Sequence, residues 1–451
     1  MSRQAVVIGG GFAGLTAAVA LSDAGWRVTV LERRNGLGGR ARSFVDPATG
    51  DIVDNGQHVF LGCYDATLKF LRRLGTADRV VFQQALEVSF AEPGAPLKTL
   101  RCPRVAGPWH LILGLAGFSG LSWLDKWHML RVLRELSGRD RLPGELDDRT
   151  VDAWLNGLGQ SPRSRRMFWD PLAIGALNDS PAESSALNFA AVVQRLAGAD
   201  WRGARLGLAS VGLSDLYTGE AARVIEARGG QIRLNTAVTG CELREDRMAA
   251  VQVGRGERLT ADAFVSAVPP GELARLLPED VFSREPRLRS LTQFTSSPIV
   301  SINLWLDRPV TDRPFVGMVG TQVQWLFNRA QLITKGRSEH VALVISAAGH
   351  LAGGPSDRVI EIALQDVQRC FPAARGAHVR RAQVVRESRG TIRTPVGSAR
   401  WRPGPSTVWT NFAIAGDWTD TGLPATIESA VLSGYKAAEK LLAEDSLRAL
   451  G

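Results

Sequence analysis

AVVIGGGFAGLTAAVALSDAGWRVTVLE, residues 5 to 32, is the stretch that decides the fold. Its apolar runs predict a buried strand at residues 5–8, a helix over residues 15–24 and a second strand over residues 27–31. The turn before the helix has the spacing GxGxxG. In that pattern the first glycine makes a tight turn, the second lets backbone approach a pyrophosphate, and the third lets the helix pack closely on the sheet. The three glycines are Gly9, Gly11 and Gly14.

An acidic residue closes this unit. Glu32 follows Gly14 by 18 residues, in the range where a carboxylate accepts hydrogen bonds from ribose hydroxyls. The phosphates of the same ligand would lie at the positive end of the helix. The stretch therefore predicts a dinucleotide site, and the alternative is a glycine-rich turn with a purely structural role.

The composition is that of a folded protein with more than one core. The chain has 451 residues, 45% of them apolar, and single cores rarely grow beyond about 250–300 residues. Four cysteines without any CxxC pair predict neither a metal site nor a disulfide framework, and they favour reduced thiols in the cytoplasm. No signal peptide is expected, because the apolar run AVVIGG begins at Ala5, directly after MSRQ.

The net charge of +9 has two explanations. Arginine-rich codon usage explains it without any function, since only six of the 54 basic residues are lysines. Attraction to an anionic surface such as lipid headgroups is the functional alternative. Nucleic acid is not expected as a partner, because the arginines are dispersed and no binding motif occurs.

A second glycine motif follows the acid. The stretch ERRNGLGGRARS, residues 32–43, resembles the motif of the flavin-dependent amine oxidase and carotenoid desaturase superfamily in which GGR runs along the pyrophosphate. That resemblance implies FAD as the dinucleotide. Arginine suits the role because its planar guanidinium pairs with phosphate oxygens, and an exposed basic turn is the alternative. The residues that the resemblance assigns to FAD here are Arg34, Gly38, Gly39 and Arg40.

The C-terminal stretch NFAIAGDWTDTGLPATIESAVLSGYKAAEKLL, residues 411–442, predicts a strand, a loop and a long helix that begins near Pro424 or Ala425. A helix N-terminus aimed at a flavin stabilises negative charge on the reduced ring. The stretch contains no cysteine, so a thioether link to flavin cannot form there and non-covalent FAD is expected. In the superfamily, GD binds the ribityl chain and the helix start approaches the ring, which implies FAD contacts for Gly416, Asp417, Ala425, Thr426 and Ile427.

The pieces between these ends predict a discontinuous domain. Residues 229–253 have the pattern of two strands, and the resemblance puts Val238 where backbone meets the adenine. Residues 261–270 predict a strand that returns to the same domain. The fold class is therefore α/β, a Rossmann-like FAD domain with an α+β substrate domain. The FAD domain is assigned to residues 1–82, 205–270 and 390–451, and the substrate domain to residues 83–204 and 271–389.

The stretch VDNGQHVFLGCY, residues 53–64, follows the GGR motif where superfamily members pass beside the flavin ring. The resemblance implies that Gly56 gives backbone clearance and that Gln57 and His58 are the first side chains to reach the ring or the substrate. His58 is the candidate catalytic acid, with a structural hydrogen-bonded histidine as the alternative. Asp54 is either a backbone anchor or a second catalytic group. Cys63 and Tyr64 are expected to pack at the start of the next helix, where Leu68, Leu71 and Leu74 face the core.

The most apolar part of the chain is VAGPWHLILGLAGFSGLSWLDKWHML, residues 105–130. Glycines and His110 interrupt it, so a membrane-spanning helix is not expected. It is either a buried helix that lines a substrate cavity or an interfacial segment in contact with a lipid surface. With the apolar stretch MFWDPLAIGALNDSPAESSALNFAAVV, residues 167–193, it predicts a hydrocarbon-like substrate.

Several segments together resemble the hydroxysqualene dehydroxylase family, also called squalene-associated FAD-dependent desaturases. They are DNGQHVFLGCY, FWDPLAIGALN, LWLDRPV, QWLFNR and AGDWTDTGLPATIESAVLSG, which extend the likeness over nearly the whole chain. That family reduces the allylic alcohol hydroxysqualene to squalene on the route to hopanoids. The resemblance implies that His58 protonates the leaving hydroxyl while reduced FAD delivers hydride from N5 to the allylic carbon.

Other functions remain open at this point. A carotenoid or phytoene desaturase would share the fold and oxidise its substrate, an amine oxidase would differ in the residues beneath the ring, and a lipid-carrying flavoprotein would catalyse nothing. The sequence does not name the electron donor for FAD or the oligomeric state. A cytoplasmic protein that is peripheral on the inner face of the membrane is expected if residues 105–130 contact lipid.

Overall fold

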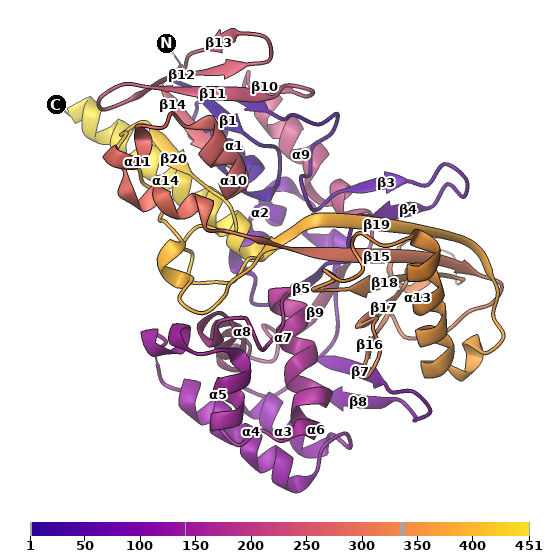
Figure 1. Ribbon diagram of the computed structural model, residues 1–451. Coiled ribbons are helices and arrows are strands. Elements are labelled where there is room, and N and C mark those ends of the chain that lie inside the picture. Colours follow the sequence, from indigo (N-terminus) through magenta and orange to yellow (C-terminus); the bar gives the residue numbers. More distant parts are fainter. Residues whose placement is uncertain (1, 140, 334–338, 451) are drawn as a thin grey trace.

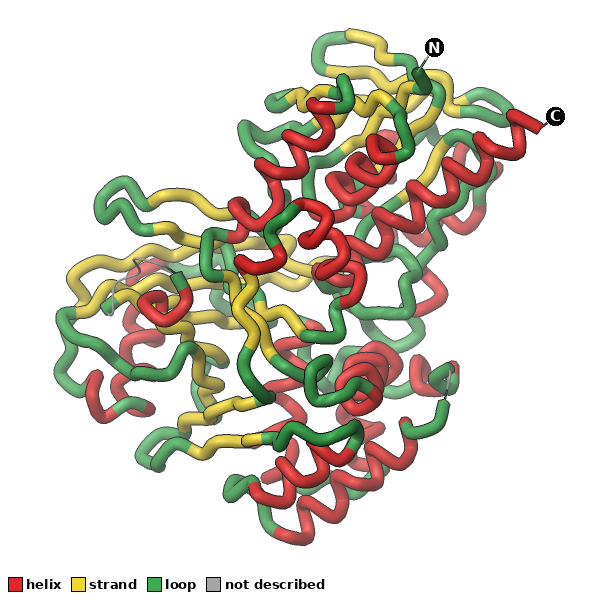
Figure 2. Tube along the Cα trace, turned by 180° about the vertical axis from the view of Figure 1, so that it is seen from behind, coloured by secondary structure: helices red, strands yellow, loops and turns green. Residues whose placement is uncertain are grey.

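The computed structural model describes residues 2–139, 141–333 and 339–450. The chain forms three parts (Figure 1). An α/β part holds both termini, a large sheet lies beside it, and a layer of helices lies at the end of the molecule farthest from the termini. Figure 2 shows the same arrangement from behind.

The α/β part is built on a parallel sheet with the strand order β10-β2-β1-β14-β20. The central strand β1 pairs with β2 on one side and with β14 on the other. Its side chains alternate between the two faces, because Ala5 and Val7 pack into one core while Val6 and Ile8 pack into another. The strands come from distant segments: β1(Gln4–Ile8), β2(Arg27–Leu31), β10(Gln231–Arg233), β14(Ala263–Ser266) and β20(Phe412–Ile414).

Helices cover one face of this sheet and a small antiparallel sheet covers the other. On the helical face Phe12 stacks on Tyr217 with ring centroids 3.7 Å apart. The helices are α1(Phe12–Asp23), α2(Asp65–Leu74), α9(Leu213–Ala227) and α14(Ile427–Leu450). The opposite face carries β11(Val238–Leu243), β12(Met248–Val253) and β13(Glu257–Leu259), followed by α10(Pro270–Leu276), α11(Val281–Arg284) and the 3₁₀ segment η4(Pro286–Thr292).

The large sheet has the order β19-β15-β18-β17-β16-β7-β8. Its two long strands, β15 and β19, are antiparallel and run from the α/β part into the sheet (Figure 1). Helix α13(Ser356–Cys370) packs on one face. The strands are β7(Glu87–Ala91), β8(Lys98–Arg101), β15(Ser296–Leu306), β16(Phe315–Met318), β17(Trp325–Asn328), β18(His340–Ile345) and β19(Val379–Ile392), with the short helix α12(Arg329–Leu332) after β17.

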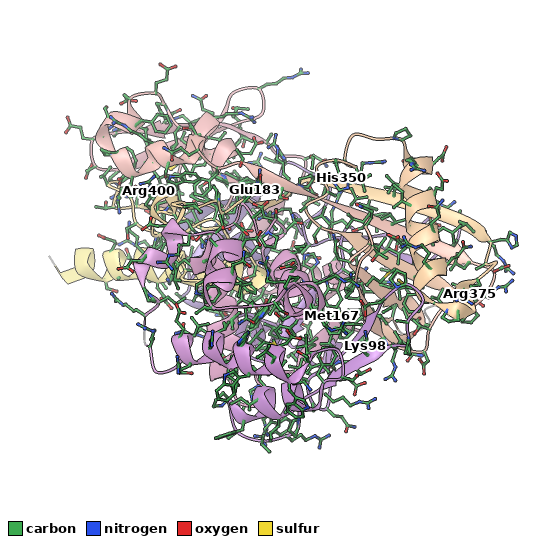
Figure 3. The ribbon with its side chains drawn as sticks, turned by 60° about the horizontal axis from the view of Figure 1, so that its bottom comes forward. Lys98, Met167, Glu183, His350, Arg375 and Arg400 are labelled. Carbon is green, nitrogen blue, oxygen red and sulfur yellow. The ribbon has the colours of Figure 1, made fainter. Side chains whose placement is uncertain are left out.

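Two small sheets link these parts. They are β3(Ser43–Val45) with β4(Ile52–Asp54), and β5(Val59–Leu61) with β9(Leu206–Ala209) and β6(Val80–Phe82). Figure 3 looks onto the helical layer, with Met167 in it and Lys98 on the neighbouring strands. The layer contains α3(Trp109–Gly117), α4(Trp123–Leu136), α5(Val151–Gly157), α6(Pro162–Ser164), α7(Asp170–Leu177) and α8(Ala186–Gly198). None of the described helices is both long enough and apolar enough to cross a membrane.

The α/β class and the strand, helix and strand predicted within residues 5–32 are confirmed, and some boundaries differ. Helix α1 begins at Phe12, three residues before the predicted start, because Gly11 already serves as its N-cap. Helix α14 begins at Ile427 rather than at Pro424 or Ala425.

Two further expectations need correction. Leu68 is half-buried, and the core positions of α2 include Phe70 in its place. Residues 105–130 form two helices rather than one, because Phe118 to Ser122 leave the helical conformation between α3 and α4.

Candidate functional site

One continuous cavity of about 660 Å³ joins the α/β part, the large sheet and the helical layer. Its polar end is lined by the glycine turn after β1, the GGR motif and the start of α14. Its other end is lined by apolar side chains of the helical layer and the large sheet. Every residue that the sequence assigned to FAD, except Gly14, lines this cavity.

The turn after β1 is fixed by close backbone contacts. Gly9 has φ +104°, which favours glycine. A Cβ on Gly14 would lie 1.9 Å from the carbonyl oxygen of Gly9, so only glycine lets α1 pack this closely behind the turn. Gly14 therefore acts by shaping the turn, in agreement with the role predicted for the third glycine.

Gly11 and Gly39 instead present bare backbone to the cavity. A Cβ on Gly11 would meet only the Cα of Gly39, at 3.9 Å, so the chain itself leaves room for a side chain there. The two glycines come from the two predicted motifs and face each other at the polar end. A side chain at Gly11 would fill cavity space rather than clash with protein.

Glu32 lies at the end of β2 with an exposed fraction of 6%. Its two carboxylate oxygens accept hydrogen bonds from the backbone N–H groups of Gly10 and Arg34, at 2.9 Å each. A carboxylate has further lone pairs, so these bonds leave it able to accept from ribose hydroxyls. The Arg34 side chain donates to the carbonyl of Gly39 at 2.9 Å and so supports the second motif.

The two ends of the chain meet at an ion pair. Arg40 Nη2 donates to Asp417 Oδ1 at 2.7 Å, across 377 residues of sequence. Burial lowers the pKa of Arg40, whereas attraction to the Asp417 carboxylate raises it, and the pKa is raised overall. The loop of Asp417 is held from behind by the buried Arg402, which donates to the backbone carbonyl of Asp417 at 2.7 Å. Gly416 precedes it with φ +142° and also lines the cavity.

The start of α14 points its first turn toward the cavity. Ala425, Thr426 and Ile427 all line it, and the Thr426 hydroxyl accepts from the backbone N–H of Ser429 at 3.2 Å. This cap uses only one of the free N–H groups of the first turn, so the others remain available to an anionic or electron-rich ligand. Val238, at the start of β11, lines the opposite side of the polar end.

The segment after β4 forms the wall between the two ends of the cavity. Gly56, Gln57 and His58 line it, as predicted. A Cβ on Gly56 would meet nothing in the chain closer than 3.8 Å, so the need for glycine at this position does not come from packing within the protein.

Asp54 does not line the cavity and lies one layer behind this wall. Its Oδ1 accepts from Ser43 Oγ at 2.6 Å and from the Leu213 N–H at 3.0 Å. Its Oδ2 accepts from Arg329 Nη1 at 2.9 Å. The sequence left two roles open for Asp54, a backbone anchor and a second catalytic group, and this arrangement fits the anchor. Any effect of Asp54 on catalysis must therefore pass through its neighbours.

Arg329 completes this buried network. It is 2% exposed, and the same Nη1 donates to Gln57 Oε1 at 2.9 Å while Nη2 donates to the Ile52 carbonyl at 3.0 Å. Gln57 therefore cannot rotate away from the cavity without breaking a bond to a buried cation. Arg329 was not among the predicted site residues, although an arginine directly after the apolar strand WLFN is itself an unusual signal.

His58 is held in one orientation. Its Nδ1 lies 3.0 Å from the carbonyl oxygen of Gly56, and since a carbonyl only accepts, Nδ1 carries the proton and donates. Nε2 is then the nitrogen available to a ligand. Burial lowers the pKa of His58, and the bond to Gly56 offsets this only in part. The neutral imidazole is therefore the resting form near pH 7.

Three more residues line the cavity, near the start of α2, on α8 and on α14. Tyr64 precedes α2, and burial raises the pKa of its phenol. Arg195 of α8 donates to the Cys63 carbonyl at 2.8 Å. Glu428, the second residue of α14, accepts from the N–H groups of Ala66 and Thr67 and thereby ties α14 to α2. The sequence analysis expected Tyr64 to serve packing alone, so its position on the cavity is a finding of the structure.

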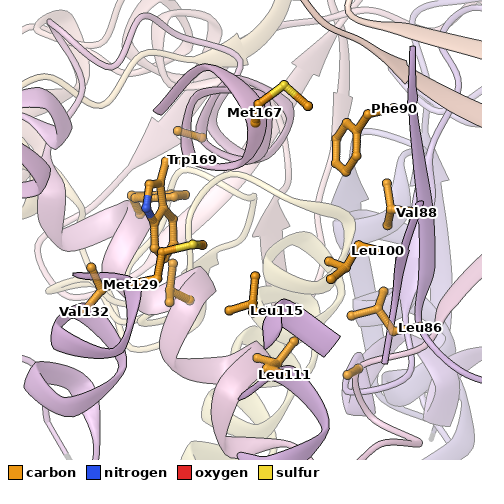
Figure 4. Close-up of a cluster of buried hydrophobic side chains, with 14 of the residues drawn as sticks. Leu86, Val88, Phe90, Leu100, Leu111, Leu115, Met129, Val132, Met167 and Trp169 are labelled. Carbon is orange, nitrogen blue, oxygen red and sulfur yellow. The ribbon is translucent and has the colours of Figure 1, made fainter. Parts of the chain in front are cut away.

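The far end of the cavity is lined mainly by apolar side chains; among the described residues of the helical layer that line the cavity, Arg195 of α8 is the charged one, and it contacts the Cys63 carbonyl and Glu428. Figure 4 shows the facing groups, with Phe90, Val88, Leu100 and Leu86 on one side and the helical layer on the other. Trp169 satisfies its indole N–H with Gln160 Oε1 at 2.7 Å, so it adds no unpaired donor. The apolar side chains of this end include Leu86, Val88, Phe90, Leu100, Leu111, Leu115, Leu133, Phe168, Leu172 and Phe315.

The polar end fits a flavin dinucleotide. It combines bare backbone at two glycines, a buried carboxylate at the ribose position and a helix N-terminus, which are the donors and the space that such a ligand needs. A family model for flavin containing amine oxidoreductases matches residues 12–442. The chain belongs to this family.

Proteins with similar sequences include hydroxysqualene dehydroxylases and phytoene desaturases. Hydroxysqualene dehydroxylases from Sinorhizobium fredii and Rhodopseudomonas palustris are 30% and 32% identical to this chain, over 98% of it and 99% of each relative. A 15-cis-phytoene desaturase from Synechococcus elongatus is 25% identical over 99% of this chain and 97% of its own. The likeness to hydroxysqualene dehydroxylases inferred from the sequence is thus confirmed.

Solved structures share the fold. An oxidoreductase from Methanosarcina mazei superposes with a TM-score of 0.76 at 19% identity, over 97% of this chain and 100% of that one. A putrescine oxidase with bound putrescine gives 0.75 at 17% identity, over 98% and 99%. These structures show the fold alone; that the chain is a flavin-dependent oxidoreductase rests on the family match over residues 12–442 and on the relatives at 30% and 32% identity.

Proposed function

We propose that the chain is a hydroxysqualene dehydroxylase, which reduces the allylic alcohol hydroxysqualene to squalene with loss of water. The observation that carries the proposal is the continuity of one cavity from a flavin-binding polar end to an apolar chamber. Relatives with that printed name match the chain over 98% of its length. A carotenoid desaturase is the second candidate, because phytoene desaturases also match nearly the whole chain.

The flavin is FAD, held without a covalent bond. Glu32 would accept from the ribose hydroxyls, Gly11 and Gly39 would pass along the pyrophosphate, and Asp417 would meet the ribityl chain. Arg40 would keep Asp417 in place through their ion pair. None of the described residues that line the cavity is a cysteine, which leaves no thiol there for a thioether link.

The chemistry that bound reduced FAD supplies is hydride donation to the allylic carbon. The protein must supply the proton: the C–O bond breaks, the hydroxyl leaves as water with that proton, and a C–H bond replaces it. His58 in its imidazolium form would donate from Nε2, since Nδ1–H is already committed to Gly56. Gln57, fixed by Arg329, would orient the same oxygen.

The apolar chamber has two tasks. It binds the hydrocarbon arms of the substrate by removing apolar surface from water. It also keeps water from the allylic cation that forms as the hydroxyl leaves, because the side chains of the helical layer and the large sheet that line it are mainly apolar. Arg195 is held by the Cys63 carbonyl and by Glu428 at the start of α14.

We place this enzyme in the cytoplasm, at the inner face of the membrane. A long isoprenoid alcohol resides in the bilayer rather than in water. All four cysteines are free thiols, which fits a reducing compartment.

The test is a single anaerobic turnover. Purified protein is reconstituted with FAD, reduced with dithionite, freed of excess reductant and mixed with hydroxysqualene. Reoxidation of the flavin together with squalene in the extract supports the proposal. The control is squalene itself, which cannot reoxidise the flavin by this reaction.

Other outcomes select the alternatives. Reduction of oxidised flavin by phytoene, with no squalene from hydroxysqualene, would identify a desaturase. Flavin binding with neither reaction would identify a carrier. Failure to bind any flavin would overturn the whole proposal.

A further inference from the structure

The outer surface of α3 and α4 is apolar and exposed. Trp123, Trp127 and Leu124 of α4 have exposed fractions of 75%, 64% and 65%. Trp109 and Leu113 of α3 have exposed fractions of 59% and 49%. These five residues are called the α3–α4 outer face. Among the described residues, all three exposed tryptophans belong to it.

The five side chains form one patch because of helix geometry and a direct link between the helices. Trp109 and Leu113 are four residues apart on α3, and Trp123 and Trp127 are four apart on α4, so each pair shares a helix face. Lys126 Nζ donates to the Ala116 carbonyl at 2.7 Å and joins the two helices. The same ammonium lies 4.5 Å from the centroid of the Trp123 ring.

The surroundings of the α3–α4 outer face are cationic. Arg131 and Arg134 lie exposed further along α4. Residues 103–139 contain five basic and two acidic residues. Both acids are turned inward, since Asp125 accepts from Ser122 and Ser161 and Glu135 accepts from Trp154 Nε1.

An arginine cluster continues this charge at the start of α3. The guanidinium carbons of Arg104, Arg202 and Arg205 lie 5.7, 4.6 and 5.6 Å from the centroid of the Trp201 ring. Backbone just before α3 touches the chain just before Trp201, because a Cβ on Gly107 would lie 2.3 Å from the Ala199 carbonyl oxygen. The apolar face therefore has positive charge at both ends.

The inner side of the same two helices lines the cavity. Leu111 and Leu115 of α3 and Leu133 of α4 contribute to its apolar end. The wall between the chamber and the outer face is thus one helix thick, at the end of the molecule farthest from the termini (Figure 1).

We propose that the α3–α4 outer face docks on an anionic phospholipid bilayer. Tryptophans with neighbouring lysine and arginine are the combination that suits the interface between headgroups and acyl chains. Each basic residue near such a surface adds about 1 kcal/mol of attraction. A second copy of this chain is a poor occupant, because it would bring the same positive charges against each other.

Docking would put the substrate chamber against the bilayer. This consequence rests on the proposed function, because it assumes that the chamber takes a lipid-dissolved isoprenoid. The docking itself does not depend on any reaction, so vesicle binding and turnover can fail separately.

The test is flotation of the flavin-loaded protein with vesicles of phosphatidylcholine alone or with phosphatidylglycerol added. We expect binding to the anionic vesicles. The triple variant Trp109→Ser, Trp123→Ser, Trp127→Ser should lose binding by about tenfold or more, because its interfacial apolar area is removed. Val45→Ser, which changes an exposed apolar residue at 61% exposure elsewhere, is the matched control and should bind normally.

A charge variant separates the two contributions. Arg131→Glu with Arg134→Glu should weaken binding to anionic vesicles by about tenfold and reduce its dependence on phosphatidylglycerol. Arg255→Glu with Arg380→Glu makes the same charge change at exposed positions away from the face and is expected to have a small effect. Absorbance of the bound flavin checks that each variant is folded.

Three results would overturn the proposal, two from flotation and one from light scattering. One is wild-type protein that stays in the unbound fraction with both vesicles. The other is a triple tryptophan variant that floats as well as the wild type. If light scattering instead shows a wild-type dimer that the tryptophan substitutions dissociate, the face is an interface between copies and the lipid proposal is wrong.

Discussion

The two ends of the cavity are built in different ways. The polar end is made of backbone: two glycines that face each other, a helix start and a few fixed charges. The apolar end is made of side chains from strands and helices that no local motif connects. Backbone contacts demand particular residues at particular positions, whereas an apolar wall tolerates exchange of similar side chains. Substitutions should therefore have large effects on ligand binding at the polar end and smaller, graded effects at the apolar end.

The harshest substitution at the polar end is Gly11→Val. The backbone of Gly11 is extended, at φ −88° and ψ −173°, and nothing in the chain lies closer than 3.9 Å to its added Cβ, so the protein should fold. The new side chain would occupy the cavity where the pyrophosphate must pass. We expect flavin binding weaker by roughly 100-fold or more, about 3 kcal/mol, measured by titration of apoprotein with FAD.

Gly36→Val is the matched control. Gly36 has open space around its Cβ and lies in the second glycine stretch, ahead of Gly38 and Gly39, without lining the cavity. It should bind flavin as the wild type does. Equal flavin affinity of the Gly11 and Gly36 variants would show that the two facing glycines do not contact the cofactor.

This contrast explains what the sequence could predict. The glycine spacing, Glu32 and the C-terminal GD are local patterns tied to fixed backbone geometry, so residues 5–32 and 411–442 predicted the parallel sheet correctly, and their candidate residues line one cavity. Arg329 could not be placed, because its partner Asp54 lies 275 residues away and only the tertiary fold brings them together. For residues 105–130 the sequence could not decide between a cavity-lining helix and an interfacial segment. Only the tertiary fold shows that one helix face lines the cavity while the other is exposed.

The buried network behind the wall gives the next largest effect. Arg329→Met leaves the Asp54 carboxylate buried with its cationic partner gone, which should cost about 3–5 kcal/mol of unfolding free energy. Adding Asp54→Asn removes the stranded charge and should restore part of that loss. Chemical denaturation monitored by tryptophan fluorescence measures both.

An exposed ion pair is the comparison for that network. Arg358→Met removes the partner of Glu361, and these side chains are 62% and 54% exposed, so the change should be within about 1 kcal/mol. An Arg329 variant as stable as the Arg358 variant would contradict a buried network that fixes Gln57.

His58 lies between the two ends and should control the rate rather than the binding. Its pKa is lowered by burial, so the imidazolium form that donates a proton becomes populated only as pH falls below about 6.5. Turnover of hydroxysqualene should rise as pH falls through that region. His58→Gln should reduce turnover about 100-fold and remove this pH dependence, with flavin affinity unchanged.

Tyr64 is the competing proton donor and sharpens that experiment. Its phenol lines the cavity and burial raises its pKa, so it stays protonated throughout the pH region in which His58 titrates. If His58→Gln keeps full turnover while Tyr64→Phe loses it, the proton comes from the phenol and the pH profile should be flat.

The mildest change tests the apolar end. Leu115→Ala removes a cavity-lining side chain from α3 and enlarges the chamber. We expect the preference among isoprenoid alcohols of different length to shift toward the longer chain by about tenfold in kcat/KM, since a methylene in an apolar pocket changes binding by about 1–3 kcal/mol.

Leu136→Ala is the control, because Leu136 is buried in the same core at 2% exposure and does not line the cavity. Both variants should lose about 2–5 kcal/mol of stability, and only the first should alter chain-length preference. Equal shifts in both would mean that stability, not the shape of the wall, sets the substrate length.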